Sequence, residues 1–253
     1  MIKYENIKLE SPFAVISDIH GNSWALEAAL EDIERRNIET VFNLGDIFYG
    51  PLDPAGTASI LRRMNIATVC GNEDRIIFEN SQPSSTLHYV RSELSLNEFN
   101  WLKSLKMEQT ISDEIFLCHG TPESDRQYLI YAVQPGGLIM RCQKEMERIL
   151  SNRTESLVLC GHDHLPNVIK LNAQQVIVNP GSVGLPAYTD DTPYEHYVEN
   201  GSPHAKYCII DKLESGWLIE HKNIPYDFAT ASEKKKKNGR EDWAYWLKTG
   251  RAK

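Results

Sequence analysis

Five short apolar segments of this chain are each followed at once by a cluster of Asp, His or Asn beside glycine. The segments lie far apart in the sequence, and in the first half they alternate with stretches whose apolar spacing is helical. A strand–helix–strand order favours right-handed crossovers and a largely parallel sheet. Because ligands bind at the carboxyl ends of strands in open α/β sheets, we expect the five clusters to meet at one edge.

The expected elements follow from the same pattern. Strands are predicted at 13–17, 41–44, 66–69 and 114–118, and helices at 22–36, 54–64, 95–103 and 135–150. The second half is predicted to form strands at 157–160, 168–171, 175–178, 207–210 and 217–221. Their brief connections favour an antiparallel meander. The irregular stretch 185–203 is expected to form a long loop near the site.

At the level of domains, we interpret residues 1–253 as one α/β domain in which two packed mixed sheets are flanked by helices. The sequence contains no internal repeat and no long linker that would mark a second domain. A short C-terminal tail is expected from about residue 230, with a short helix at 243–246.

Composition argues against several classes of function. The net charge of −8 is unfavourable for a broad nucleic-acid or anionic-membrane surface, so no stable nucleic-acid partner and no membrane contact are expected. No stretch approaches the roughly 18 apolar residues that span a bilayer. Residues 1–10 are polar and unlike a signal peptide. The five cysteines form no CxxC pair, and a reducing, cytoplasmic location is expected.

The clusters offer oxygen and nitrogen ligands without thiolate. In chain order they are Asp18-Ile19-His20-Gly21-Asn22, Gly45-Asp46, Gly71-Asn72-Glu73-Asp74, His119-Gly120 and Gly161-His162-Asp163-His164. Carboxylate, imidazole and amide donors favour Mn, Fe, Zn or Mg over copper(I) or iron–sulfur chemistry. Asp18 and His20 alternate along an extended backbone and so point the same way, as do His162 and His164. Each cluster alone is weak evidence, but the order and placement of all five indicate a metal site.

The full set, DxH–GD–GNxD–HG–GHxH, resembles the calcineurin-like metallophosphoesterase superfamily across roughly residues 12–212. Two further segments, Asn179-Pro180-Gly181-Ser182 and Tyr49-Gly50-Pro51, are similar to its small bacterial and archaeal phosphodiesterase branch. The resemblance implies a four-layer α/β/β/α sandwich, which agrees with the two-sheet interpretation above.

The resemblance also implies a set of metal ligands. One divalent metal ion would be held by Asp18, His20, Asp46 and His164. A second would be held by Asp46, Asn72, His119 and His162, so that Asp46 bridges the two ions. Manganese is the first expectation for both, with Fe, Zn, Ni and Mg as alternatives.

The expected activity is hydrolysis of a phosphoester by a binuclear metal centre, with in-line attack of a metal-bridging hydroxide on phosphorus. The catalytic candidates are His20, Asp46, Asn72 and Glu73. Many relatives carry His where this chain has Glu73, so Glu73 either acts as the general acid or only orients a neighbour. Asp74 is expected to orient a histidine, as it does in relatives.

The expected substrate is a small phosphoester or a nucleotide-type molecule. A phosphodiester or a phosphoanhydride, such as a dinucleoside polyphosphate, is preferred, with a phosphomonoester as the alternative. A non-catalytic interaction scaffold of the same fold is the competing class of function. The oligomeric state is left open, with a homo-oligomer among the options.

A few residues outside the motifs are further candidates. Arg75, Arg126 and Arg141 could contact a substrate phosphate or form structural salt bridges, and Tyr188, His196 and His204 could line the pocket. Ser182 lacks a GxSxG frame, so we expect it to serve a turn rather than act as a nucleophile.

Overall fold

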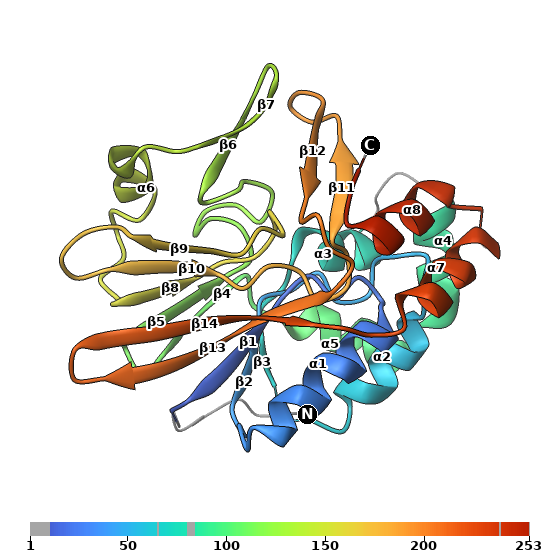
Figure 1. The fold of residues 1–253 in the computed structure, drawn as a ribbon, viewed down its shortest axis with the longest axis horizontal. Coiled ribbons are helices and arrows are strands. Elements are labelled where there is room, and N and C mark those ends of the chain that lie inside the picture. The colour runs from blue at the N-terminus through green and yellow to red at the C-terminus, as the bar shows by residue number, and fades with distance from the viewer. Residues whose placement is uncertain (1–10, 65, 80–83, 238, 253) are drawn as a thin grey trace.

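A computed structural model describes residues 11–64, 66–79, 84–237 and 239–252. The polar start at residues 1–10, used above to argue against a signal peptide, lies outside the described residues. In the described part of the chain, two five-stranded mixed sheets form the centre of the molecule (Figure 1).

The first sheet has the strand order β14-β13-β1-β2-β3. Its strands are β1 (Phe13–Ile16), β2 (Val41–Asn43), β3 (Ala67–Thr68), β13 (Ala205–Leu213) and β14 (Gly216–Ile224). The three N-terminal strands run parallel, as predicted, and β13 joins β1 antiparallel. Helices α1 (Ser23–Arg35) and α2 (Pro54–Leu61) form the crossovers. Both begin at side-chain caps, with Asn22 accepting from the Ala25 N–H and Asp53 from the Gly56 N–H.

The second sheet has the strand order β4-β5-β8-β10-β9. Its strands are β4 (Glu108–Ile111), β5 (Ile115–Cys118), β8 (Leu157–Leu159), β9 (Asn167–Lys170) and β10 (Val176–Asn179). The expected antiparallel meander is wrong for the centre of this sheet, because β5, β8 and β10 run parallel. β9 lies at the edge of the sheet and pairs antiparallel with β10. β10 therefore lies next to β8 and runs parallel to it.

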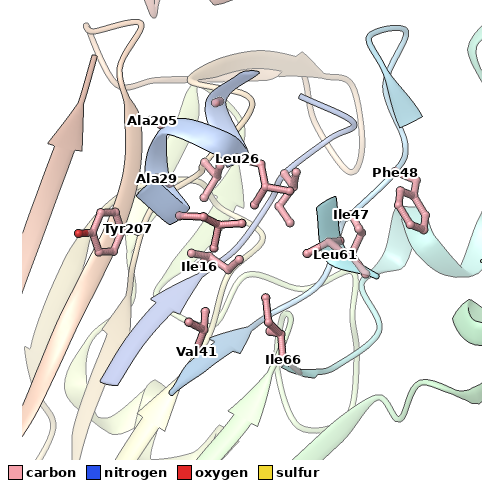
Figure 2. Close-up of a cluster of buried hydrophobic side chains, with 14 of the residues drawn as sticks. Ile16, Leu26, Ala29, Val41, Ile47, Phe48, Leu61, Ile66, Ala205 and Tyr207 are labelled. Atoms are coloured by element: carbon pink, nitrogen blue, oxygen red, sulfur yellow. The ribbon is translucent and has the colours of Figure 1, made fainter. Parts of the chain in front are cut away.

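Successive residues of a strand face opposite sides of its sheet, so buried apolar side chains form three clusters through the sandwich. Ala14 and Ile16 of β1 face the helices, in the cluster of buried side chains that Figure 2 shows around Leu26 and Tyr207. Phe13 and Val15 face the other way, into a cluster shared with the second sheet. On the far side of the second sheet, helix α6 (Gln143–Ile149) packs over a further apolar cluster. The four-layer α/β/β/α sandwich is therefore confirmed.

The helix predicted at 135–150 is only partly correct. Residues Tyr131–Gln134 and Gly137–Met140 form a hairpin, β6–β7, and only Gln143–Ile149 is helical. The turn is Pro135-Gly136, and Gly136 and Gly137 have φ values of 103° and 128°. Left-handed backbone of this kind is easy for glycine and incompatible with a helix, so the Pro-Gly-Gly run is a turn signal.

The region 185–203 is not an irregular loop. Its strands β11 (Ala187–Asp190) and β12 (His196–Glu199) pair antiparallel into a hairpin that stands beside helix α8 (Glu241–Thr249) in Figure 1. The predicted helix at 243–246 is confirmed as part of α8, which follows α7 (Phe228–Lys237). Trp243, Trp246 and Leu247 of α8 are buried in a cluster with Leu185 of the hairpin region.

Three further helices cover the end of the first sheet. They are α3 (Asn72–Phe78), α4 (Ser85–Glu93) and α5 (Leu96–Ser104). The start of α5 is capped by Ser95, whose side chain accepts the Asn97 N–H, and the Glu98 carboxylate accepts the Ser95 N–H. No helix in the described part of the chain has the length and apolar character that crossing a membrane requires.

Candidate metal centre

The polar clusters follow the carboxyl ends of β1, β2, β3, β5 and β8, four of them in loops and the third at the start of α3. The loop after β1 is hydrogen-bonded to the loop after β2, with the Asp18 N–H donating to Gly45 and the His20 N–H donating to Asp46. Within the second sheet, the Gly161 N–H donates to the carbonyl of His119. Between the sheets, Nδ1 of His119 lies 2.8 Å from the carbonyl of Leu44. Contacts of this kind bring the distant segments of sequence to one edge of the sandwich, as predicted.

The backbone of these loops is strained. Of the eight non-glycine residues with positive φ in the described ranges, five are predicted ligands: Asp18, His20, Asp46, His162 and His164. A left-handed conformation costs such residues of the order of 1 kcal/mol each, and it persists only where surrounding contacts enforce it. The concentration of strain on these five residues indicates that their side-chain directions are what the loops are built to fix.

The first group of ligand atoms comes from Asp18, His20 and His164, all buried. The Nε2 atoms of His20 and His164 are 3.2 Å apart, and His164 Nε2 lies 3.3 Å from Oδ1 of Asp18. The other carboxylate oxygen of Asp18 accepts the His162 N–H at 3.2 Å, whereas Oδ1 is buried without a hydrogen-bond partner.

The second group comes from Asp46, His119 and His162. His119 Nε2 lies 3.3 Å from Oδ2 of Asp46 and 3.0 Å from Oδ1 of Asn72. The rings of His119 and His162 are 4.9 Å apart between centroids. All seven residues predicted as ligands are therefore close together, in two adjacent groups within the described residues.

Asp46 connects the two groups. It also belongs to a third set of potential ligands, with His20 and Glu73. Its Oδ1 accepts the Glu73 N–H at 2.9 Å, while its Oδ2 faces His119. The approach is possible because residue 71 is glycine: a Cβ there would lie 2.1 Å from Oδ1 of Asp46.

A cavity of about 300 Å³ opens over both groups. Its floor is made by predicted ligands, among them Asp46, Asn72 and His162. Its walls come from Tyr49, from Tyr128, from the hairpin β11–β12 and from α8. The size is at the lower end of the range for small-molecule sites, which suits a compact substrate.

The comparisons with known proteins agree with this geometry. The family model of the calcineurin-like phosphoesterase superfamily domain matches residues 12–199. The chain belongs to the calcineurin-like phosphoesterase superfamily. Family membership and the expected fold class are thus confirmed, and the family assignment supports phosphoester hydrolysis as the class of activity.

Relatives of this phosphoesterase match along most of their length. An uncharacterised protein of Methanocaldococcus jannaschii is 27% identical over 252 residues, which cover 93% of this chain and 96% of the relative. A metallophosphoesterase from Sphaerobacter thermophilus has a TM-score of 0.74 at 22% identity, covering 95% of this chain and 99% of that one. A hypothetical protein from Pyrococcus horikoshii OT3 has a TM-score of 0.73 at 20% identity, with coverages of 96% and 99%. Both solved structures share the fold.

The donor atoms of this phosphoesterase fit divalent metal ions. Ligands about 2.1 Å from one cation lie roughly 3.0–3.4 Å apart, which is the spacing found in both groups. His20, His119 and His164 each place Nδ1 2.8–2.9 Å from a backbone carbonyl. A carbonyl only accepts, so Nδ1 carries the hydrogen, and in the neutral ring Nε2 presents its lone pair to the site.

Charge within the site also favours cations. Burial opposes the charge of Asp46, but His119 and His20 outweigh it and hold the pKa of Asp46 well below its usual range. Burial likewise disfavours charged imidazoles, yet Asp46 and its neighbours raise the pKa of His119 to about 10, and Glu73 with Asp46 raises that of His20 to about 9. His162 behaves differently, because burial and the charge of His119 lower its pKa to about 4.

Glu73 lies at the edge of the centre. Its Oε2 is 3.1 Å from Nδ1 of His20, but that nitrogen donates to the Tyr49 carbonyl, and Oε2 has no hydrogen-bond partner. Burial raises the pKa of Glu73 to about 7, although the neighbouring His20 opposes the shift. Glu73 thus lines the cavity next to a predicted ligand, in a position to affect how His20 is held.

Asp74 does not orient a histidine, which corrects the prediction. Its carboxylate accepts the backbone N–H groups of Asp46, Ile47 and Gly71 at 2.8, 2.8 and 3.1 Å. It therefore holds the turn that carries Asp46. The GNxD spacing places Asp74 one helical turn into α3, where its side chain returns to the start of the helix and the loop beside it.

The Asn179–Ser182 segment also supports the centre without lining it. Asn179 donates to the Gly161 carbonyl and to Asp163, both at 2.9 Å, which fixes the turn bearing His162 and His164. Ser182 donates to the Asp18 carbonyl at 2.8 Å and accepts the Leu185 N–H. The turn role expected for Ser182 is confirmed.

Of the candidates outside the motifs, only Tyr188 lines the cavity. Tyr188 lines the cavity and donates a hydrogen bond to the His162 carbonyl, whereas His196 contacts the Tyr128 hydroxyl behind it. Arg75 is occupied by Asp125 and Glu79. Arg126, Arg141 and His204 are not among the residues that line the cavity. The sequence interpretation missed Tyr128, Arg240, Trp243 and Trp246 as cavity residues, because they lack any local motif, and it named Tyr49 only as part of a family signature.

Proposed function

We propose that this chain is a binuclear metal-dependent phosphoesterase that hydrolyses the phosphodiester or phosphoanhydride bonds of small phosphoesters. The observation that carries the proposal is the pair of adjacent ligand groups joined by Asp46 on the floor of one cavity. A single group would suit a structural ion. Two adjacent groups that face an open cavity, with the Asp46 carboxylate near His119 of one and His20 of the other, are typical of hydrolytic centres.

The residues would divide the work as follows. Asp18, His20 and His164 would hold one divalent ion, and Asn72, His119 and His162 the other, with Asp46 shared. Two divalent cations, manganese first among them, would when bound supply an activated water and positive charge for the phosphoryl oxygens. In the hydrolysis, a water oxygen forms a bond to phosphorus, the bond from phosphorus to the leaving oxygen breaks, and that oxygen takes up a proton.

Glu73 is proposed to orient His20 rather than to act as the general acid. The support is its position 3.1 Å from Nδ1 of His20, on the side of the ring opposite to the ligand atom Nε2. Carboxylates beside a ligating histidine commonly fix the ring and raise its basicity. Without a dedicated acid, the enzyme should favour substrates with good leaving groups.

The test is activity after metal removal and reloading. The chain is treated with chelator, its metal content is measured, and hydrolysis of bis(p-nitrophenyl) phosphate is compared before and after addition of Mn. Loss of activity with the metal and its return with Mn support the proposal. Full hydrolysis after verified metal loss would contradict it. Binding of less than one ion per chain at saturating Mn would favour the non-catalytic scaffold instead.

Comparing a diester with a monoester tests the substrate class separately. Each aryl substrate releases the same p-nitrophenolate, so a difference in kcat/KM reports the phosphoryl group and not the leaving group. A higher kcat/KM for bis(p-nitrophenyl) phosphate than for p-nitrophenyl phosphate is expected. The reverse order would assign the enzyme to the phosphomonoesterases of the same fold.

A further inference from the structure

Arg240 brings a positive charge to the wall of the cavity. It is the residue before α8, and among the described residues that line this cavity it is the only Lys or Arg. The other acidic or basic side chains of the lining, apart from the histidines, are the carboxylates Asp46, Glu73 and Asp190. Outside the metal centre, Arg240 is therefore the described lining residue whose positive charge would attract an anionic substrate.

The guanidinium of Arg240 is held in a defined orientation. Its Nε and Nη2 donate to the two carboxylate oxygens of Asp242 at 2.9 and 2.7 Å, and its Nη1 donates to Thr86 of α4 at 2.8 Å. An arginine side chain normally loses considerable rotamer entropy when it binds an anion. Part of that cost is already met, because the hydrogen bond to Thr86 holds one nitrogen of the guanidinium even when Asp242 gives way to another anion.

The indole ring of Trp243 lies close to both the Arg240 guanidinium and the predicted metal ligand His20. Its ring centroid lies 5.6 Å from the guanidinium carbon of Arg240 and 5.9 Å from the ring centroid of His20. Arg240 and His20 thus contact the same indole ring. The guanidinium therefore lies on the same wall of the cavity as His20 without belonging to the ligand groups, within reach of a second phosphate of a bound molecule.

The ion pair of Arg240 is open to solvent on the side of Asp242. The side chain of Asp242 is 41% exposed and that of Arg240 is 30% exposed. Because Arg240 also lines the cavity, an anion that enters the cavity can reach its guanidinium.

We propose that Arg240 binds a second phosphate of the substrate, remote from the phosphorus that is attacked, so that the enzyme prefers organic polyphosphates to esters with one phosphorus. The proposal rests on the proposed function. A guanidinium suits this task because its forked N–H groups match phosphate oxygens, and a phosphate can exchange with the exposed Asp242 carboxylate. The ion pair with Asp242 then keeps Arg240 in place until substrate arrives.

The experiment compares three substrates on the Mn-loaded wild type and on Arg240→Gln. Bis(p-nitrophenyl) phosphate has one phosphorus and no nucleoside, thymidine 5′-(p-nitrophenyl phosphate) adds a nucleoside, and diadenosine tetraphosphate adds further phosphates. The ratio of kcat/KM for the tetraphosphate to that for the thymidine diester should fall about 10-fold or more in Arg240→Gln, mainly through KM. Arg240→Lys keeps the positive charge but lacks the forked N–H groups, so its substrate ratio should lie between those of the wild type and Arg240→Gln.

Arg62→Gln is the matched control, because Arg62 is also an ion-paired arginine but caps the C-terminal end of α2 in contact with Glu98, and it does not line this cavity. Its substrate ratio should equal that of the wild type. Equal losses on all three substrates in Arg240→Gln would assign Arg240 a structural role and overturn the proposal. Equal losses on both nucleoside substrates would assign it to the nucleoside and overturn it as well. If the Mn-loaded wild type cleaved none of the three, the proposed function itself would fail.

Discussion

The Nε2 atoms of His20 and His164 face each other at 3.2 Å, although both rings place Nδ1 against a backbone carbonyl. The raised pKa of His20 means that this pair attracts a proton, which can bridge the two nitrogens at that distance. In neutral rings of this tautomer both Nε2 atoms carry lone pairs, so a divalent cation could take the place of the proton and accept two coordinate bonds. The nearby Oδ1 of Asp18, buried without a hydrogen-bond partner, would be the third donor.

Asp46→Asn should cause the largest loss among single ligand changes. The substitution keeps the shape of the side chain but removes the negative charge that both groups share. We expect kcat/KM for an aryl diester to fall about 100-fold or more, together with a lower Mn content. Asp191→Asn, an exposed position in the β11–β12 connection, is the control and should retain wild-type activity. Activity of Asp46→Asn within threefold of wild type would remove Asp46 from its bridging role.

Glu73→Gln separates the two roles that the sequence left open. If Glu73 only orients His20, the variant should lose about 10-fold in kcat/KM on all aryl diesters, whatever the pKa of the leaving phenol. A general acid would instead make the loss much greater for poor leaving groups. The measurement is the slope of log kcat/KM against leaving-group pKa in both proteins. A steeper slope in Glu73→Gln would show that the orienting role is wrong.

Asp74→Asn tests the support of the Asp46 turn. The amide nitrogen of Asn cannot accept, so at least one of the three backbone N–H groups would be left without a partner in a buried site. We expect the free energy of unfolding to fall by about 2–3 kcal/mol, even with chelator present. Urea denaturation provides the measurement, and Asp113→Asn on an exposed turn is the control. An unchanged midpoint in chelator would mean that Asp74 acts only through the metal centre.

Asp32 provides a prediction about pH. Burial opposes its charge, but hydrogen bonds from Arg36 and Tyr207 prevail and lower the pKa of Asp32. A carboxyl group with a lowered folded pKa stabilises the fold above its unfolded value of about 3.9, and the contribution is lost as pH falls through the folded pKa. Asp32→Asn should therefore cost about 1–2 kcal/mol at pH 7.

The measurement for Asp32 is urea denaturation of both proteins from pH 7 down to the lowest pH at which they remain folded. The stability gap between wild type and Asp32→Asn should narrow below about pH 4. A gap that stayed constant over this range would assign the stabilisation to packing rather than to the charge of Asp32.

The sequence predicted the floor of the site well because the relevant signals are local. Each predicted ligand directly follows an apolar strand, and the order of strands determines which loops meet. The role predicted for Asp74 is wrong because the GNxD spacing cannot distinguish a carboxylate that binds histidine from one that accepts backbone N–H groups. The helix predicted at 135–150 is wrong over its first half, because Pro135-Gly136 forms the turn of a hairpin there. The Pro-Gly turn signal is a stronger indicator at this position than the apolar residues that follow it.

The walls of the cavity could not be predicted in the same way. Arg240 and Trp243 lie more than 70 residues after the last ligand motif, and nothing in their neighbourhood marks them as cavity residues. Their position depends on how α8 packs against β11 and on the hydrogen bond from the Ala252 N–H to Glu199. Contacts of this kind arise from the assembled fold, and periodicity and motif spacing do not reveal them.

Anomalous diffraction from crystals grown with Mn tests most directly whether the seven residues hold two ions. Two Mn peaks are expected in each chain. One should be coordinated by Asp18, His20 and His164, the other by Asn72, His119 and His162, with Asp46 in contact with both. A single peak at saturating Mn, or two peaks without a shared Asp46, would contradict a binuclear centre bridged by Asp46.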